Sequence, residues 1–369
     1  MSEQRNILVL GASGLIGRFV TDDLRLRGRT VIGIARRYSA SQRRSASDLE
    51  IPILAMTSGA LARLIRDNKV GVIVNCLGVL QDGPGSDTRA VHRDFVAGLV
   101  QAIHDSGQTL RLIHVSIPGT AGEDRTAFSL TKREAEGLIA ASGIGYAILR
   151  PGFVIAPSAY GGSAIVRALA ALPFDLPASE AATPFQPVAA SDIAETIAFL
   201  AGRDIDDEAT RAVAWDLMQP QKISLSGVVA QFRFAFGSKD FPRITVPKFL
   251  LDLGAKLGDL SSWFGWMPPM RSTAIAELRR GITGNPSAWM AGLCQRPSHK
   301  RSGSIRRPFR TNGSRGCFWS SRSRSQASRC SGLRPGSSRW SFRFRQPRRS
   351  LPDTALRPGW PRHSPPPPA

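Results

Sequence analysis

The chain has 369 residues, enough for one large α/β domain or two smaller ones, and its formal net charge is +21. Residues 295–369 hold 17 Arg and one Lys against a single acid, Asp353, whereas the other 294 residues carry 31 basic and 27 acidic side chains. The strong positive charge therefore belongs to the C-terminal tail. The body is mildly basic and gives no reason to expect a nucleic-acid-binding fold.

The four cysteines, Cys76, Cys294, Cys317 and Cys330, lack the paired C-x-x-C spacing of a zinc site, and their distribution does not indicate a disulfide framework. No basic segment followed by an apolar one precedes the first predicted strand, so we expect no signal peptide. The longest apolar stretches, such as residues 70–80, are shorter than the ~20 residues that a membrane helix needs. We therefore expect a cytoplasmic protein.

Short runs of Val, Ile and Leu alternate with helical patterns through the first half of the chain. Nearly continuous apolar runs are typical of parallel strands that helices cover on both faces. They predict strands over residues 6–11, 30–35, 51–55, 71–78, 110–116 and 146–152. The segments between them predict helices over residues 15–27, 58–67, 88–106 and 127–142. This alternation predicts an α/β fold with a doubly wound parallel sheet, whose core is residues 1–151.

After residue 151 the pattern becomes irregular and rich in Pro, Gly and Ala. Helices are predicted over 163–172, 190–202 and 224–237, and a further strand over 212–217. Residues 246–269 are amphipathic and dense in Leu, Phe and Trp. We interpret this segment as a helical cap over the substrate end, in preference to a membrane-surface helix. Residues 152–293 are thus predicted to form a substrate or cap region that is interleaved with the core.

Residues 294–369 show neither helical nor strand periodicity and are dominated by Ser, Arg, Pro and Gly. Such a composition cannot bury enough apolar surface to offset the ordering entropy, so we expect a disordered tail. The interpretation that we favour is a frameshift, because a GC-rich gene translated out of frame has this composition and the change is abrupt. A solvated basic linker and a nucleic-acid-binding arm are the alternatives, and the nucleic-acid role is the weakest of them.

Residues 6–20, NILVLGASGLIGRFV, place three glycines between a predicted strand and a predicted helix. Gly11 permits the tight turn, Gly14 lets the backbone approach a pyrophosphate, and Gly17 allows close packing of helix on strand. The helix N-terminus adds free N–H groups and a positive dipole end. The loop predicts a dinucleotide site formed by Gly11, Ser13, Gly14, Leu15, Ile16 and Gly17. The alternative is a glycine-rich turn without a ligand.

The second predicted strand ends in IGIARR. An NAD site usually carries Asp or Glu near this point, to accept a hydrogen bond from the ribose 2′-hydroxyl. Arg36 and Arg37 stand there instead, and the first acid after them is Asp48. Because a guanidinium pairs well with a phosphate, NADP is favoured over NAD as the cofactor. The alternative is that both arginines only begin a solvated basic loop.

Four further segments bear on the class of protein: VNCLGV at 74–79, HVSIPG at 114–119, LRPGFVIAP at 149–157 and QPVAASDIAETI at 186–197. Together with the glycine loop they resemble the short-chain dehydrogenase/reductase superfamily, in its extended or atypical branch with epimerase-like Rossmann folds. The resemblance implies that the backbone at Leu77–Gly78 passes the adenosine side of the cofactor and that the Pro151–Gly152 turn lines the nicotinamide. It also places Ser116 where the family carries a catalytic Ser or Thr, and it implies a small-molecule substrate.

More narrowly, the chain looks like the complex I accessory-subunit-like and NmrA-like relatives, many of which bind NADP without clear catalysis. Some bacterial relatives of this type continue into a DoxX-like membrane domain, where this chain has its basic tail. The resemblance therefore implies membrane association in the intact family form.

The family's general acid is a Tyr four residues before a Lys, a spacing that puts both side chains on one helical face. Lys132 is present in this chain and keeps its implied role in holding the cofactor, but the position four residues before it is Phe128. Loss of a general acid is typically worth a factor of ~10²–10⁴ in rate. Efficient reduction is therefore not expected unless another donor substitutes, and Tyr160 is the candidate. The alternatives are a solvated Lys132, a buried structural Ser116 and a Tyr160 that only packs.

Three histidines in the first half, His92, His104 and His114, lack partners at metal-ligand spacing and are interpreted as structural. The leading hypothesis is an NADP(H)-binding atypical short-chain dehydrogenase-like protein with weak, specialised or absent oxidoreductase activity. The alternatives are an active reductase or epimerase that uses a substitute acid, and a cofactor-sensing or scaffold protein linked to a membrane or quinone system.

Overall fold

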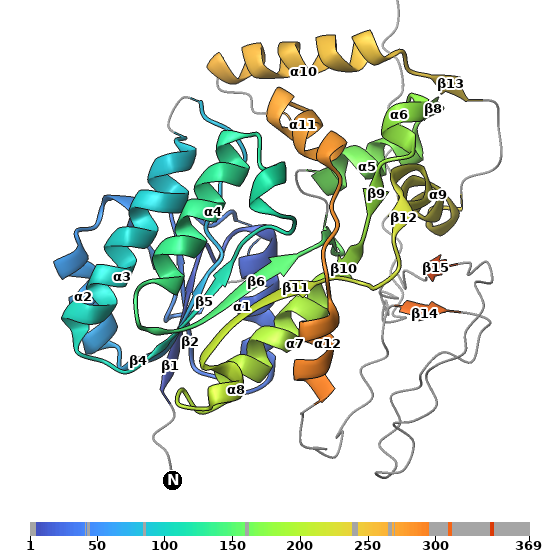
Figure 1. Cartoon of the computed structure of the whole chain (residues 1–369). Helices are drawn as coiled ribbons and strands as arrows, with labels where there is room; N and C mark the ends of the chain where they lie inside the picture. The colour runs from blue at the N-terminus through green and yellow to red at the C-terminus, as the bar shows by residue number, and fades with distance from the viewer. Residues whose placement is uncertain are drawn as a thin grey trace, which may run out of the picture.

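The computed structural model describes residues 5–40, 42, 45–83, 86–158, 162–237, 243–264, 268, 270–294, 309–311 and 340–342. Its centre is a seven-stranded parallel sheet in the order β11-β6-β5-β4-β1-β2-β3 (Figure 1). In chain order the strands are β1 Asn6–Leu10, β2 Val31–Ala35, β3 Leu49–Glu50, β4 Val70–Asn75, β5 Arg111–Val115, β6 Gly145–Pro151 and β11 Ala212–Leu217. The predicted doubly wound α/β fold is therefore confirmed.

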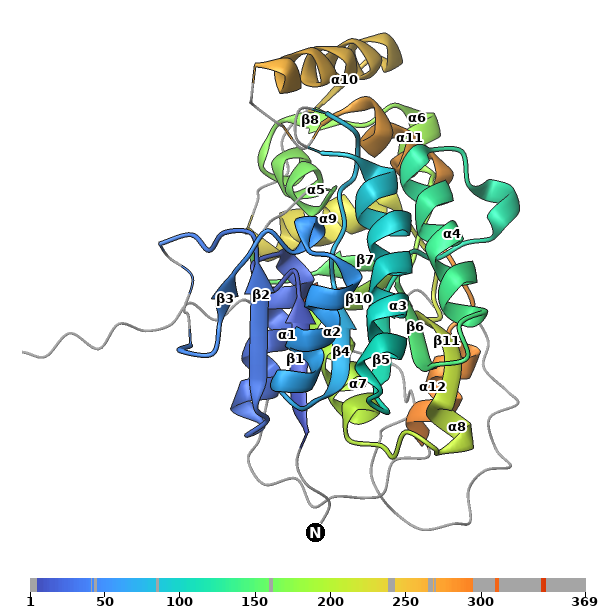
Figure 2. The ribbon, with the colours of Figure 1, turned by 90° about the vertical axis from the view of Figure 1, so that its left-hand side faces the viewer.

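Helices cover both faces of the sheet, and the strands alternate their side chains between the two cores. Ile7 and Val9 of β1 point to one core, and Leu8 and Leu10 point to the other. The first core is closed by α1 Leu15–Leu26, α7 Ala190–Ala201 and α12 Ser287–Cys294. The second is closed by α2 Ser58–Asp67, α3 Phe95–Ser106 and α4 Ala127–Ala140 (Figure 2). Both faces of the sheet are thus buried, as the continuous apolar strands predict.

A smaller layer follows β6 and has an apolar core of its own, around Phe153, Phe185 and Phe232. It contains the helices α5 Gly162–Ala171, α6 Ala178–Ala181, α9 Leu225–Ala235, α10 Lys248–Trp263 and α11 Ser272–Arg280. Three pairs of short strands lie within this layer: β7 Phe153–Ile155 with β10 Pro187–Ala189, β9 Pro184–Phe185 with β12 Ile223–Ser224, and β8 Phe174–Asp175 with β13 Ile244–Thr245. The chain returns to the sheet through α7, the short helix α8 Glu208–Arg211 and β11. It then enters the smaller layer again for α9, α10 and α11, and ends on the sheet with α12.

The predicted strand over residues 51–55 is wrong. Only Leu49 and Glu50 pair with β2, and Ile53–Ala55 form a 3₁₀ turn that buries Ile53. Pro52 has no N–H to donate to a ladder, so the apolar run turns into the core instead of extending the sheet. The predicted helix over 88–106 is also irregular, because Ala90–Asp94 form a π-helical turn before α3.

Of the predicted tail, the structure describes β14 Phe309–Thr311 and β15 Trp340–Phe342, which pair antiparallel, and the rest of that prediction lies outside the described residues. Within the described part of the chain, no helix combines the length and the apolar character needed to cross a bilayer.

Candidate functional site

The glycine loop leads from β1 into α1 at the carboxyl edge of the sheet. Gly11 has a φ of +78°, in the left-handed region that favours glycine, and its N–H donates to the carbonyl of Ile34 at 2.9 Å. A Cβ on Gly17 would lie 2.2 Å from the Gly11 carbonyl oxygen. Only glycine therefore lets α1 start this close to the turn.

The first turn of α1 faces this edge without a side-chain cap. Gly14 is the N-cap residue and offers no side-chain acceptor to the N–H groups that follow it. Helix geometry leaves those groups, from Leu15 and Ile16 onward, without an intrahelical acceptor, and the helix dipole adds partial positive charge. Ser13 and Gly14 are half-buried beside them. The cradle fits a phosphate group, which would supply the missing acceptors.

The loop after β2 folds back onto the glycine loop. The Gln42 side-chain amide donates to the carbonyl oxygen of Ser13 at 2.8 Å. Arg36 and Arg37, at the start of this loop, are exposed. Two cationic side chains therefore emerge at the carboxyl end of β2, next to the segment that contacts the glycine loop.

The acids that follow these arginines in the sequence are already engaged. Asp48 is buried and accepts hydrogen bonds from the Arg25 side chain and from the N–H of Gly33. Burial alone would raise the pKa of Asp48, but these bonds outweigh it and hold the pKa below its ordinary value. Glu50 accepts a hydrogen bond from the N–H of Tyr38 at 2.7 Å. The Asp48 carboxylate is thus part of the structure beneath β2.

Lys132 joins the ends of two neighbouring strands. Its ammonium group is buried and donates to the carbonyl oxygens of Leu77 and Val115, each at 3.0 Å. Burial lowers its pKa to about 8. A Cβ on Gly78 would lie 3.6 Å from the Lys132 Nζ atom, so the strand-four segment and the lysine are in contact. One N–H of the ammonium group remains for a further acceptor.

His92 lies beside Lys132 and is held as a neutral ring. Its Nε2 accepts from the N–H of Val79 at 3.1 Å, and its Nδ1 lies 2.9 Å from the Thr131 hydroxyl, which itself donates to the carbonyl of Ala127. Burial, with the charge of Lys132, lowers its pKa to about 3. Because both ring nitrogens are engaged, His92 is a positioning group and does not stand ready to transfer a proton.

Phe128 lies one helical turn before Lys132 on α4, as the spacing predicts, with its ring edge-to-face on His92 at a centroid distance of 5.5 Å. Thr126 begins the helix, and its hydroxyl accepts from the N–H of Ser129. Glu277 of α11 accepts a hydrogen bond from the same hydroxyl. The start of α4 is therefore fixed from the smaller layer, and the side chain fixed there is a phenyl ring without a proton to donate.

Ser116 directly follows β5 and is buried next to Glu136. Burial alone would raise the pKa of Glu136, but the hydrogen bonds and the positive charge of Arg150 hold it below its ordinary value. Arg150 donates to both carboxylate oxygens of Glu136, at 3.0 and 2.7 Å. Ser116 thus lies next to a buried ion pair whose carboxylate, Glu136, is on the same helix as Lys132.

Pro151 and Gly152 end β6 with a close backbone contact. A Cβ on Gly152 would lie 2.1 Å from the carbonyl oxygen of Gln186, and its N–H donates to the carbonyl of Leu217 at 2.9 Å. This glycine is therefore required for packing, whatever else the turn lines. Tyr160, the predicted substitute donor, lies outside the described residues.

One member of this edge, Asn75, is not among the residues predicted from the sequence. Asn75 is buried, its amide nitrogen lies 3.1 Å from Nδ1 of His114, and its side-chain oxygen accepts from the N–H of Leu77. A polar residue that closes the apolar run VGVIVN was the available signal. His92, which the sequence indicates to be structural, is a positioning group here, and its partner Thr131 lies 39 residues further along the chain.

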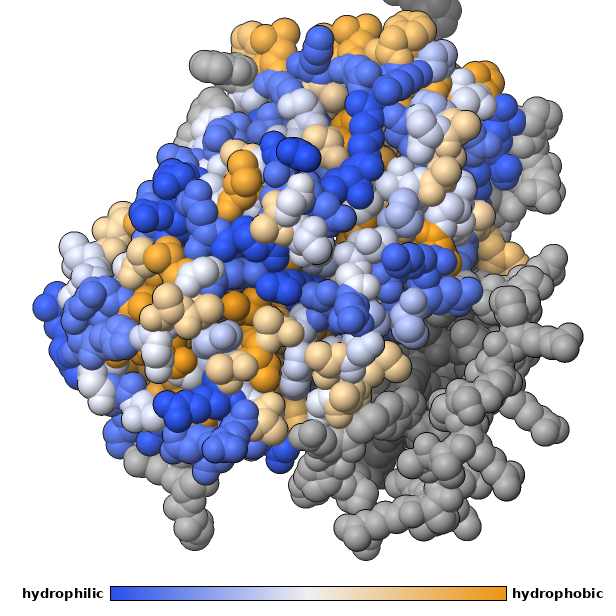
Figure 3. Space-filling model, in the orientation of Figure 1, coloured by the Kyte–Doolittle hydropathy of each residue, from blue (hydrophilic) through white to orange (hydrophobic). Residues whose placement is uncertain are grey.

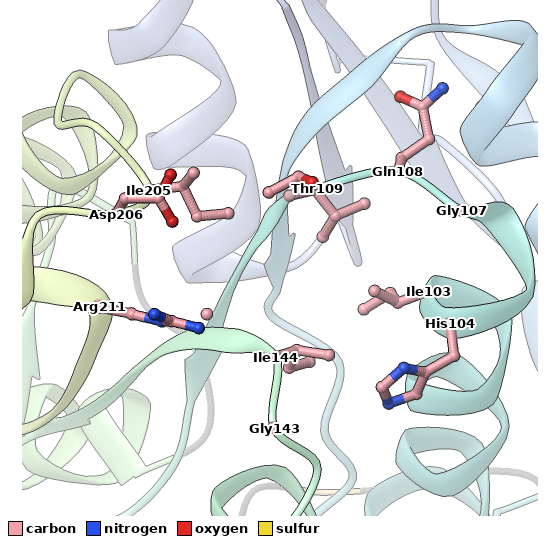
Figure 4. Close-up of a pocket in the computed structure, with 12 residues that line it drawn as sticks. Ile103, His104, Gly107, Gln108, Thr109, Gly143, Ile144, Ile205, Asp206 and Arg211 are labelled. Atoms are coloured by element: carbon pink, nitrogen blue, oxygen red, sulfur yellow. The ribbon is translucent and has the colours of Figure 1, made fainter.

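A surface pocket lies at the opposite, amino edge of the sheet (Figure 4). It has a volume of about 220 Å³ and is formed where the chain enters β5 and β6, with His104, Thr109, Asp206 and Arg211 in its wall. Ligands of open α/β sheets bind at the carboxyl ends of the strands. The glycine loop and Lys132, not this hollow, therefore form the candidate site.

Comparison with known proteins gives the same picture. Residues 7–172 match the model of the NAD dependent epimerase/dehydratase family. The match contains the glycine loop, Lys132 and the Pro151–Gly152 turn, and it confirms the resemblance to the extended short-chain dehydrogenase/reductases. The narrower resemblance to complex I accessory-subunit-like and NmrA-like relatives stays a prediction. No curated protein matches the chain.

Two solved structures with bound NAD share the fold of this chain. The Bordetella bronchiseptica enzyme WbmG in complex with NAD has a TM-score of 0.57 and 15% sequence identity, over 81% of this chain and 91% of that one. The UDP-glucose 4-epimerase of Thermus thermophilus in complex with NAD has a TM-score of 0.57 and 16% identity, over 80% of this chain and 95% of that one. At these identities the likeness shows the fold alone.

Proposed function

We propose that the protein binds NADP(H) along the carboxyl edge of the sheet and has weak, specialised or absent oxidoreductase activity. The observation that carries the proposal is the uncapped first turn of α1 behind the Gly11 turn, with Lys132 retained on α4 and Phe128 in place of the family's acid. The family match and the NAD-bound structural neighbours support a nicotinamide dinucleotide as the ligand.

Different residues would bind different parts of the cofactor. The N–H groups of α1 would hold the pyrophosphate, and the backbone at Leu77–Gly78 would lie along the adenosine side. The remaining N–H of Lys132 would serve a ribose hydroxyl. When bound, the nicotinamide supplies a hydride or accepts one.

Arg36 and Arg37 favour the phosphorylated cofactor. Both are exposed at the end of β2, and Asp48, the first acid after them, is held by Arg25 beneath the strand. A ribose 2′-phosphate would meet two guanidinium groups there, whereas a ribose 2′-hydroxyl would lack the usual carboxylate acceptor.

Catalysis is weakened because neither Phe128 nor His92, the side chains near Lys132, can serve as the acid. Phe128 has no dissociable proton, and the neutral His92 uses both ring nitrogens in hydrogen bonds. Ser116 and Lys132 remain as groups that can bind a carbonyl oxygen or hold the cofactor. A cofactor-sensing role is therefore the second candidate, and the inert Phe128 and the engaged His92 are the observation that favours it.

Titration of the full chain with NADPH and with NADH, followed by fluorescence, tests the proposal. We expect NADPH to bind at least tenfold more tightly than NADH. The variant R36A/R37A should lose most of that preference, because each charged contact to a phosphate is worth ~1.5–3 kcal/mol. The matched control R63A/R66A, on α2, should keep it. No binding of either cofactor below millimolar concentration would overturn the proposal, and a preference for NADH would overturn its assignment of NADP.

A further inference from the structure

Helix α10 carries an apolar surface that faces away from the protein. It lies across the top of the molecule, beyond the carboxyl edge of the sheet, in both ribbon views (Figures 1 and 2). Its exposed apolar residues, here called the outer stripe, extend one residue past the end of the helix and are Phe249, Leu250, Leu253, Leu257, Leu260 and Phe264. Their spacings of three and four residues keep them on one side of the helix. Apolar residues line the top of the molecule in the space-filling view (Figure 3).

The opposite side of α10 is firmly packed. Leu251, Ala255 and Ser262 are buried, and a Cβ on Gly258 would lie 2.0 Å from the carbonyl oxygen of Met270. The helix is therefore docked on the protein by one complete face. The outer stripe is a second apolar face, and the packing of the helix on its own protein leaves it in solvent.

The acidic side chains of α10 contact the rest of the protein, whereas its lysines are exposed. Asp252 pairs with Arg279 at 2.7 Å, and Asp259 accepts from Gln81 at 2.7 Å and lies 3.6 Å from Arg271. Both acids are thus bound to other parts of the protein. Between Lys248 and Ser262, the exposed residues are all Leu, Phe or Lys, the lysines being Lys248 and Lys256. The outward side is apolar and cationic.

We propose that the outer stripe inserts into the headgroup region of an anionic membrane. Interfacial helices combine Leu and Phe, which enter the acyl boundary, with Lys, which stays among the phosphates. Residues 1–294 carry a net charge of +4 and residues 295–369 one of +17, and both add attraction to anionic lipid. The helix has 16 residues and lies along the surface, so this is attachment and not a membrane span.

A second copy of the chain fits the outer stripe less well. A helix of 16 residues is about 24 Å long and offers a face about 10 Å wide. That face is too small to bury the roughly 800 Å² per partner of a stable protein interface. Lysine is also depleted from the centres of protein interfaces, whereas a lipid surface accommodates it.

Attachment through α10 would turn the cofactor edge toward the membrane. Gln81, which bonds Asp259, and Asp82, whose carbonyl accepts from Arg271 at 3.0 Å, belong to the segment that leaves β4 after Leu77–Gly78. The same segment therefore joins the outer helix to the candidate site. Lipid binding itself needs no cofactor and stands independently of the proposed function.

The test is flotation of the full chain with vesicles of phosphatidylcholine and phosphatidylglycerol (7:3) in 0.5 M NaCl. The screening length is then about 4 Å, so attraction by the basic tail is suppressed while apolar insertion persists. We expect the natural chain to float, the variant L253D/L257D to partition at least tenfold less, and L253F/L257F to bind like the natural chain. The control L26D/L54D changes two leucines that are as exposed, and it should bind within twofold of the natural chain.

Three outcomes would overturn the proposal. The natural chain could fail to float at this salt concentration, or L253D/L257D could bind as well as the control variant. The third outcome is that the natural chain sediments as a dimer, that L253D/L257D sediments as a monomer, and that neither protein binds lipid. A second copy of the chain would then cover the outer stripe. Since Leu253 and Leu257 are 49% and 56% exposed, the thermal unfolding midpoints of the variants should match that of the natural chain.

Discussion

Replacement of Lys132 by Met tests whether this lysine is a buried charge that ties β4 to β5. The ammonium group donates to the carbonyl oxygens of Leu77 and Val115, and burial lowers its pKa from 10.5 to about 8. Each hydrogen bond from a charged group is worth ~1.5–3 kcal/mol, and the pKa shift corresponds to about 3 kcal/mol of burial cost. At pH 7 these terms nearly offset, so the variant should lose no more than about 3 kcal/mol of stability.

The difference between the natural chain and K132M should grow as the pH rises. Because the folded-state pKa is depressed, the unfolded chain binds more protons at Lys132 than the folded chain does between about pH 8 and pH 10.5. Stability from this group therefore rises through that window. Between pH 7 and pH 10 the advantage of Lys132 over Met should increase by about 2–3 kcal/mol.

Urea unfolding followed by circular dichroism at pH 7 and pH 10 measures this difference, in which ionisation elsewhere in the protein cancels. The control is K222M, at an exposed lysine, which should show the same offset from the natural chain at both pH values. An offset for K132M that stays constant within about 0.5 kcal/mol would refute the view of Lys132 as a desolvated ammonium group.

Three further variants probe the site and its support. The variant F128Y should raise NADPH-dependent carbonyl reduction by ~10²–10⁴-fold if the rest of the site is competent, measured at 340 nm over a panel of carbonyl compounds; unchanged null activity favours the sensing role. The variant G17A should weaken NADPH binding at least tenfold, because its Cβ would lie 2.2 Å from the Gly11 oxygen, whereas G98A on α3, where a Cβ meets nothing within 4 Å, should bind normally. The variant R111M should lose at least about 2 kcal/mol of unfolding free energy, because Arg111 is fully buried and donates to Thr210 and to the carbonyl of Leu200. A smaller loss in urea melts would contradict the view that these bonds stabilise the fold.

The fold followed from the sequence wherever periodicity and glycine chemistry agreed. Apolar strands such as VIGIA are buried on both faces, which is why their pattern predicts a parallel sheet without ambiguity. The glycine loop was equally readable, since a left-handed Gly11 and a contact that excludes a Cβ at Gly17 are local constraints. The segment 51–55 misled because an apolar run is also compatible with a buried turn.

The candidate site was predictable only in part, because much of it depends on contacts across the chain. Motif spacing located Phe128 and Lys132 on one helix, but not the two carbonyl oxygens that hold the ammonium group. The pairing of His92 with Thr131 joins two helices and leaves no spacing signal. The two faces of α10 were visible as one amphipathic segment, and only its packing shows which leucines point outward.

Amide hydrogen exchange of the full chain with and without NADPH locates the cofactor-binding residues. We expect slower exchange over residues 11–17 and over the loop that follows β2, together with Leu77 and Gly78. The hollow at the amino edge, around Gly107–Leu110 and Gly143, should show no change. Protection confined to that hollow, or no protection of the glycine loop at saturating NADPH, would contradict a cofactor site at the carboxyl edge.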